Sequence, residues 1–202
     1  MHQQTVSPVI LAAALSACTQ QPELLNSERI ENQFGNYQVV VLGQEAGVRR
    51  SSLYSVQDGV DTYRTYAVVQ FADADIAEIE QAHRDVLAGQ SIGTTFKDSG
   101  WNIRKDTLHI GKLPMPGSQN QIGQLMRLDH GIDLAVHVYR MTLEKSDLSI
   151  QYATIVEVHH PDYMTEAALH ELYAIDAGRQ ISPPDLALLL SLIINPVASD
   201  AA

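Results

Sequence analysis

The fold is decided by two runs of residues, Arg50-Ser-Ser-Leu-Tyr-Ser-Val-Gln57 and Val60-Asp-Thr-Tyr-Arg-Thr-Tyr-Ala-Val-Val-Gln-Phe71, which flank the dipeptide Asp58-Gly59. Two-residue hairpin loops favour Asp-Gly because both central residues need a positive φ. The second run alternates β-branched and aromatic residues between its two sides, as a strand does. The stretch therefore predicts an antiparallel hairpin in which Tyr54 lies opposite Tyr63 as an aromatic cross-strand pair.

Further strands are predicted on both sides of this hairpin. Residues 132–143 and 148–159 are two long alternating runs around a short polar segment, and they predict a second hairpin. Residues 102–113 form a less regular strand candidate, because Lys105 and His109 occupy its otherwise apolar side. Residues 37–42 contain three consecutive valines, which suggests a strand buried on both faces.

Helices are predicted where apolar residues recur with helical spacing between a capping residue and a glycine or proline. These segments are 26–34, 76–88, 92–99, 162–178 and 185–195, with a weaker helical pattern over 119–128. The side chains expected to cap the first four are Asn26 or Ser27, then Asp75, Ser91 and Asp162. His83 falls on the apolar side of the second helix, where we expect a hydrogen-bonded core residue and not a ligand.

The last of these helices is unusual because it is apolar on nearly every side. Leu186, Leu189, Leu190 and Ile193 lie on one side, and Leu188, Leu192 and Ile194 on the other. Eleven residues give a length of roughly 16 Å, half the hydrocarbon core of a bilayer, so the helix cannot span a membrane. It is expected to lie in a groove of its own domain, or to bury one side there and present the other to a partner or a membrane surface.

The order of elements is similar in the two halves of the chain: three strands followed by a capped helix. Three residues around the first hairpin, Asp61, Tyr66 and Ala67, recur at a constant offset as Asp147, Tyr152 and Ala153. The sequence therefore predicts an α+β fold, with an antiparallel sheet of about five to six strands and helices packed on one face. Two β-β-β-α halves, related by an internal duplication, are compatible with this order.

Composition limits the functions that the chain can have. An apolar content of 45% with 18% charged residues describes a globular chain. The 24 acidic and 13 basic residues give a net charge of −11, which repels phosphate backbones, and no Lys/Arg cluster counters it. Nucleic-acid binding is therefore not expected. A single cysteine, Cys18, excludes an internal disulfide.

The surroundings of that cysteine suggest processing. An uncharged apolar run, residues 6–15, ends in Leu15-Ser16-Ala17-Cys18, and the polar segment 19–22 follows. This order resembles the lipobox of bacterial lipoproteins. The resemblance implies cleavage before Cys18, a lipid on its thiol and a mature domain tethered in the cell envelope. Thr19 in place of Asp is similar to the signal for the outer membrane, facing the periplasm. The competing interpretation is an ordinary N-terminal segment with a free thiol.

On this basis the chain divides into three parts. Residues 1–17 are the expected lipoprotein signal peptide, residues 18–34 a tether with a short helix, and residues 35–202 a single α+β domain that includes the C-terminal apolar helix.

Catalytic signatures are largely absent from the sequence. It has no Gly-rich phosphate loop, no nucleophile elbow and no His-Glu-x-x-His zinc motif. The best metal candidate is His159-His160-Pro161-Asp162, with Glu166 or His170 one helix turn apart. Adjacent histidines on a strand point to opposite faces, so at most one can join Asp162. The alternative is a polar strand end followed by an N-cap.

A second cluster, Asp129-His130 with Asp133, pairs a carboxylate with an imidazole for acid/base chemistry, but it also has the composition of a turn. Two hypotheses follow. The first is a non-catalytic lipoprotein module, without cofactor or metal, that binds a protein or another envelope component. The second is a tethered hydrolase or metalloenzyme that uses Asp129/His130 or His159/His160/Asp162. Convergence of these two clusters in one pocket would favour the enzyme.

Overall fold

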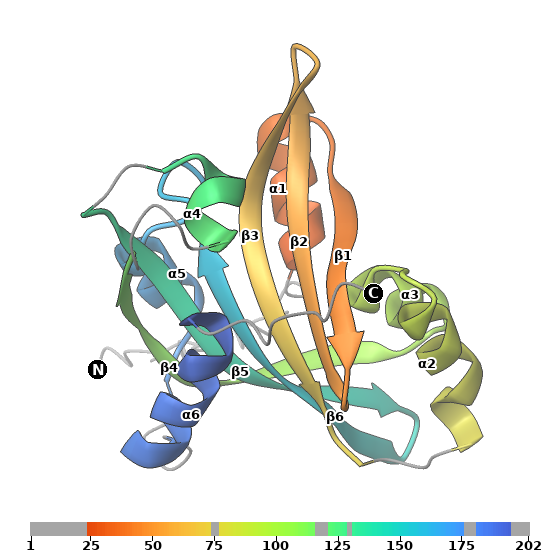
Figure 1. Ribbon diagram of the computed structural model, residues 1–202. Helices are drawn as coiled ribbons and strands as arrows, with labels where there is room; N and C mark the ends of the chain where they lie inside the picture. The colour runs from red at the N-terminus through yellow and green to blue at the C-terminus, as the bar shows by residue number, and fades with distance from the viewer. Residues whose placement is uncertain (1–23, 74–76, 116–120, 129–130, 176–180, 195–202) are drawn as a thin grey trace, which may run out of the picture.

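A computed structural model describes residues 24–73, 77–115, 121–128, 131–175 and 181–194. Six strands form one antiparallel sheet in the order β1-β2-β3-β6-β5-β4 (Figure 1). The strands are β1 (Gln38–Glu45), β2 (Val48–Gln57), β3 (Val60–Phe71), β4 (Asn102–Pro114), β5 (Asp133–Lys145) and β6 (Leu148–His159). The helices are α1 (Asn26–Phe34), η1 (Ala77–Ile79), α2 (Glu80–Leu87), α3 (Ile92–Asp98), α4 (Gln121–Met126), α5 (Glu166–Leu172) and α6 (Pro183–Ile194).

The predicted hairpin is confirmed. Strands β2 and β3 join through Asp58 and Gly59, whose φ values of 52° and 76° are both positive. Tyr54 pairs with Tyr63, and their ring centroids lie 5.3 Å apart. The second hairpin, β5 to β6, also forms where the alternation predicts it.

The sheet consists of two three-stranded meanders that meet where β3 pairs with β6. This order is compatible with two similar halves. However, Tyr66 and Tyr152, which correspond in the suspected repeat, pack in different clusters on opposite faces of the sheet. The reason is an irregularity in the β5–β6 ladder, where Met141 pairs with Ala153 but Thr142 pairs with Gln151. Tyr152 is the extra residue, so the side-chain alternation shifts there.

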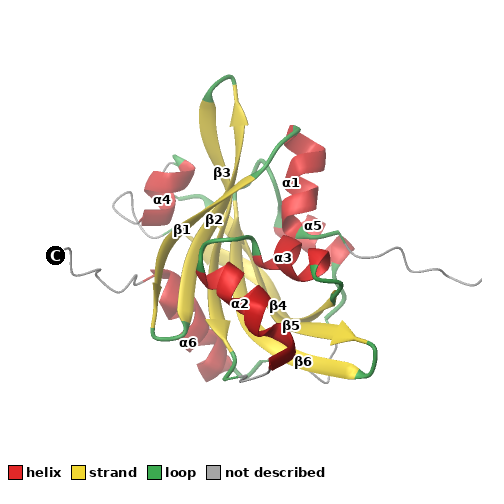
Figure 2. Ribbon diagram, turned by 90° about the vertical axis from the view of Figure 1, so that its right-hand side faces the viewer, coloured by secondary structure: helices red, strands yellow, loops and turns green. Residues whose placement is uncertain are grey.

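The predicted α+β class and antiparallel sheet are confirmed, but the helices lie on both faces of the sheet and not on one. Figure 2 shows α4 and α6 on one side and α1, α2, α3 and α5 on the other. We call these sides the α4/α6 face and the α1/α3 face. Two layers of helices are needed because β5 is apolar in both directions: Val136 and Val138 pack on the α4/α6 face, whereas Ala135 and Tyr139 pack on the other.

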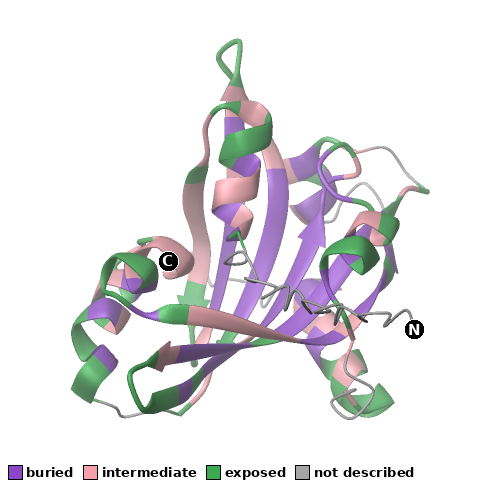
Figure 3. Ribbon diagram, turned by 180° about the vertical axis from the view of Figure 1, so that it is seen from behind, coloured by how far each residue is buried: buried purple, intermediate pink, exposed green. Residues whose placement is uncertain are grey.

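Strand β1 differs from its prediction in burial. The three valines suggested a strand buried on both faces, yet β1 is an edge strand and Val39, Val40 and Val41 are only partly buried. Seen from behind, the central strands are buried while the edge strand beside α3 is not (Figure 3). A run of valines therefore marks strand propensity here and not a central position.

Several predicted caps are wrong in detail. Helix α1 is preceded by Leu25, whose N–H donates to Glu28 Oε2 at 2.7 Å, so Asn26 and Ser27 lie inside its first turn. Helix α5 is capped by Thr165, whose Oγ1 accepts from the N–H of Ala168 at 3.2 Å.

Asp162, the predicted cap of α5, lies instead in the turn that precedes the helix. Ser91 precedes α3 as predicted but makes no capping hydrogen bond. Asp75 lies outside the described residues.

Helix α6 buries mainly one side, although Leu192 on the other side is also partly buried against the same cluster. Leu189 and Ile193 are 7% and 1% exposed and pack against the apolar residues of the α4/α6 face. Leu188, on the other side, is 64% exposed. Among the described helices, none has the length and apolar character needed to cross a membrane.

Candidate functional site

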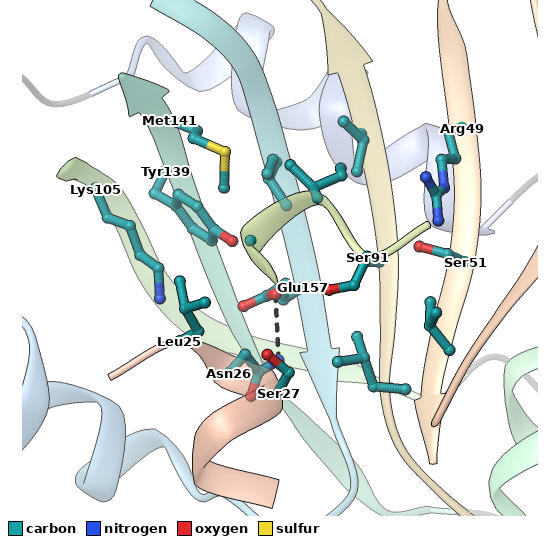
Figure 4. Close-up of a pocket in the computed structure, with 17 residues that line it drawn as sticks. Leu25, Asn26, Ser27, Arg49, Ser51, Ser91, Lys105, Tyr139, Met141 and Glu157 are labelled. Atoms are coloured by element: carbon teal, nitrogen blue, oxygen red, sulfur yellow. Dashed lines mark hydrogen bonds between the residues drawn. The ribbon is translucent and has the colours of Figure 1, made fainter. Parts of the chain in front are cut away.

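A pocket opens on the α1/α3 face of the sheet. Its floor receives side chains from all six strands, and the N-terminal ends of α1 and α3 form its walls (Figure 4). The apolar lining consists of Leu25, Val39, Leu53, Ala67, Val69, Ile92, Met141 and Ile155. The polar lining includes Asn26, Ser27, Arg49, Ser51, Ser91, Lys105, Tyr139 and Glu157. The free volume is about 70 Å³.

Polar groups lie on two sides of this pocket. In Figure 4, Lys105 and Tyr139 lie on one side of Glu157, and Ser91, Ser51 and Arg49 lie on the other. The Lys105 ammonium nitrogen is 5.4 Å from the ring centroids of both Tyr139 and Tyr173, within the range of a cation–π interaction. A charged lysine and a buried carboxylate thus share the same end of a mostly apolar pocket.

The first residue of α1 ties the helix to the sheet at this end. Asn26 Nδ2 donates to Glu157 Oε1 at 3.2 Å and to Thr65 Oγ1 at 3.1 Å. The hydroxyl of Tyr163 in turn donates to Asn26 Oδ1. Because Asn26 also lines the pocket, the position of α1 sets the shape of the pocket wall.

His159 lies beneath this network. Its Nδ1 is 3.0 Å from Thr65 Oγ1, and its Nε2 is 3.9 Å from Glu157 Oε2, too far for a hydrogen bond. Complete burial, with a smaller contribution from the charge of Lys105, lowers the pKa of His159 to about 3. The imidazole is therefore neutral at physiological pH. Thr65, the hydroxyl that contacts it, is 0% exposed, so no substrate reaches this pair without a rearrangement.

A second buried histidine lies on the neighbouring strand. His137 Nε2 is 3.0 Å from Thr107 Oγ1, and its ring stacks on Tyr173 with centroids 4.3 Å apart. Burial, the charge of Lys105 and the nearby His159 hold the pKa of His137 well below its usual value. This histidine is also neutral and held by packing.

Arg49 has a structural role at the other side of the pocket. Its Nη1 donates to the carbonyl oxygens of Val86 at 2.7 Å and Gln90 at 2.9 Å, at the C-terminal end of α2. A cation is favourable there because the last carbonyl groups of a helix carry partial negative charge. Arg49 therefore fixes the α2–α3 connection, and with it the α3 wall of the pocket.

The predicted metal candidates do not converge. His159 faces Thr65 and Tyr163, whereas the His160 Nδ1 accepts from the N–H of Asp162 at 3.1 Å. Burial lowers the pKa of His160 despite the nearby Asp162 carboxylate. No group of three or more His, Cys, Asp or Glu side chains within the described ranges is arranged to hold a metal ion.

Only some of the remaining predicted site residues lie in the described part of the chain. Cys18, Asp129 and His130 lie outside the described residues. Glu166 and His170 are on α5 as predicted, and Glu166 Oε2 lies 3.6 Å from the ammonium of Lys112. His83 is confirmed as a hydrogen-bonded residue: its Nδ1 is 2.9 Å from the hydroxyl of Tyr152.

Asn26 and Glu157 were not predicted as pocket residues from the sequence. Glu157 had a signal, since it is the one charged residue within the apolar end of β6. Its partner Asn26 had none, because the two residues are 131 positions apart and meet only through the packing of α1.

No protein-family model matches the chain, and no curated protein matches it significantly.

Proposed function

We propose that this protein is a lipid-anchored lipoprotein of the bacterial cell envelope, held in the outer membrane facing the periplasm, and that it is a non-catalytic binding module. Residues Leu15-Ser16-Ala17-Cys18 support the lipid anchor. The pocket on the α1/α3 face is the proposed binding site, and its ligand is a protein or another component of the envelope.

The observation that carries this proposal is that residues close to Cys18 in the sequence line the pocket. Leu25, Asn26 and Ser27 line the pocket, and Leu25 is seven residues after Cys18. Seven residues reach at most about 25 Å when extended. A lipid on Cys18 would therefore keep the mouth of the pocket close to the membrane surface, where envelope components are concentrated.

Binding fits this geometry better than catalysis does. The two buried histidines nearby, His137 and His159, do not line the pocket, are held by hydrogen bonds and packing, and are neutral. General acid/base catalysis needs a group with a pKa near the working pH that also reaches the substrate. His159 has a pKa of about 3 and contacts a fully buried hydroxyl, so it meets neither condition.

Photo-crosslinking in the native envelope tests the proposal. A photoreactive amino acid replaces Val39, which lines the pocket, or Val60, a control residue at the exposed β2–β3 hairpin that is 45% exposed. We expect a discrete adduct from position 39 and none from position 60. The absence of an adduct at position 39, or equal adducts at both positions, would refute a binding role for the pocket.

Metabolic labelling with palmitate tests the anchor. We expect label in the wild-type chain and none in Cys18→Ala. Equal labelling of the two chains, or no labelling of either, would refute the lipoprotein assignment. It would not affect the crosslinking test of the pocket as a binding site.

A further inference from the structure

A second, more open hollow, which we call the outer groove, lies next to the pocket. The two share Val39 and Ser91. The outer groove lies between the start of β1 and α3, with a free volume of about 370 Å³. Its other lining residues are mostly amides and hydroxyls: Tyr37, Gln38, Gln90, Thr94, Thr95 and Asp98. The two hollows are therefore neighbours, with Val39 and Ser91 between them.

The two hollows suit different parts of a ligand. A dry cavity of about 150 Å³ accommodates benzene. The pocket, with about 70 Å³, has room for the end of one aliphatic side chain and not for a whole drug-sized molecule. The outer groove is larger, and its amide and hydroxyl groups are the partners that a peptide main chain uses.

The outer groove runs beside a free sheet edge. Among the described strands, β1 pairs only with β2, so no described strand pairs with the other edge of its main chain. From Gln38 to Gln44 this strand has no charged residue and no proline. The opposite edge strand, β4, carries Arg104, Lys105 and Lys112 and ends in Pro114, features that block pairing with another strand. Of the two edges, β1 is the one without charge or proline in its regular part, Gln38 to Val41, which ends at an irregularity before Gly43.

Charge indicates a further property of the ligand. Asp98 is exposed at the outer groove, and its carboxylate makes no ion pair with any of the described residues. The chain as a whole has a net charge of −11, which attracts cationic ligands. A lysine or arginine on the ligand would complement Asp98.

We propose that this surface binds an extended peptide segment of a partner protein. The main chain of the peptide lies in the outer groove and adds to the edge of β1, one aliphatic side chain enters the pocket, and a neighbouring Lys or Arg pairs with Asp98. This inference rests on the binding function proposed above and specifies the class of partner for the same site.

The test uses the full chain carrying Cys18→Ala and a displayed library of random ten-residue peptides as the probe. We expect the selected peptides to share an aliphatic residue with a nearby Lys or Arg. Replacing that aliphatic residue by Gly in the best peptide should weaken binding by about 10-fold or more, because the contact of one buried aliphatic side chain is lost.

Two variants of the protein test whether the peptide binds to this surface. Ala67→Met fills the pocket and should abolish binding. Asp98→Lys should weaken binding by about 2-fold to 10-fold, whereas the matched control Asp61→Lys, at the exposed start of β3, should leave it unchanged. Circular dichroism of each variant confirms that it is folded.

Two outcomes would overturn the inference: no enrichment over the Ala67→Met chain, or selected peptides that bind wild type and Ala67→Met equally. An adduct at position 39 whose mass identifies a saccharide or a lipid would also overturn it, although the proposed binding function would then stand. The absence of any adduct at position 39, by contrast, would refute the proposed binding function itself.

Discussion

The two faces of the sheet are covered in different ways. On the α4/α6 face a single apolar cluster extends from Tyr66 and Val68 on β3 to Leu189 and Ile193 on α6. On the α1/α3 face the apolar residues form two clusters, one with α2 and α3 and the other with α1 and α5. Buried polar residues lie on this face as well, and the pocket opens between the helices.

The α4/α6 face mainly stabilises the domain, whereas the α1/α3 face carries the proposed binding site. Apolar burial stabilises a domain directly, whereas buried polar groups cost free energy unless every one is hydrogen-bonded. Within the described part of the chain, His137 Nδ1 and His159 Nε2 on the α1/α3 face have no hydrogen-bond partner, and on the α4/α6 face the same is true of the Tyr66 hydroxyl. What distinguishes the α1/α3 face is the open pocket between its helices, which the proposed binding function would explain.

The largest expected effect is on the α4/α6 face. Truncation after Ile181 removes α6 and exposes the apolar residues beneath it. At about 1.5–3 kcal/mol for each buried side chain, losing Leu189, Ile193 and their partly buried neighbours costs about 5 kcal/mol or more, comparable with the whole stability of a small domain. We expect loss of soluble folded protein, measured by yield and circular dichroism.

The control for this truncation is Leu188→Ala, which changes the exposed side of the same helix and should alter stability by less than about 0.5 kcal/mol. The double variant Leu189→Ala/Ile193→Ala separates α6 from the residues that follow it. Wild-type melting temperatures for both the truncated chain and the double variant would contradict the packing described here.

A smaller effect is expected on the α1/α3 face. Asn26→Ala removes the amide that joins α1 to Thr65, Glu157 and Tyr163. Leaving these buried groups without their partner should cost about 1–3 kcal/mol, measured by chemical denaturation. Asn32→Ala, on the exposed side of α1, is the matched control and should have almost no effect. If the two variants were equally stable, the hydrogen-bond network would not hold α1.

The same face should make the domain sensitive to acid. His159 has a pKa of about 3 when folded and about 6.5 when unfolded, so the unfolded chain binds more protons between these values. Stability therefore falls as the pH decreases from about 6.5 towards 3. From this residue alone, the free energy of unfolding should be about 2 kcal/mol lower at pH 5 than at pH 7.

Denaturation at the two pH values measures this loss. His159→Gln should reduce the difference between pH 7 and pH 5, whereas His170→Gln, an exposed control on α5, should not. An unchanged pH dependence in His159→Gln would show that His159 is not the buried neutral group described here.

Local signals predicted most of the fold. Asp58-Gly59 and the alternation that flanks it predicted the β2–β3 hairpin because turn chemistry and side-chain period act within a few residues. The sequence did not predict that helices cover both faces, because alternation along β5 and β6 cannot show what covers the second apolar side. A strand was likewise predicted over residues 37–42, where β1 (Gln38–Glu45) forms, but its place at the edge depends on the whole sheet.

The candidate site was harder to predict than the fold. The site residues predicted from the sequence were histidines adjacent along the chain, such as His159 and His160. In the structure these two side chains lie in separate environments. The pocket instead combines residues far apart in the sequence, such as Asn26, Ser91 and Glu157. Each has an ordinary local role, so only the tertiary structure brings them together.

The measurement that tests the central claim most directly compares the free energies of unfolding of Ala67→Met and Ala135→Met. Both alanines are buried on the α1/α3 face, but Ala67 lines the pocket and Ala135 lies in the packed cluster under α1 and α5. If the pocket is open space kept for a ligand, Ala67→Met should leave stability unchanged or raise it, whereas Ala135→Met should cost about 1–3 kcal/mol by overpacking. Equal destabilisation by the two substitutions would contradict the account, because it would mean that the face is packed at the pocket as closely as elsewhere.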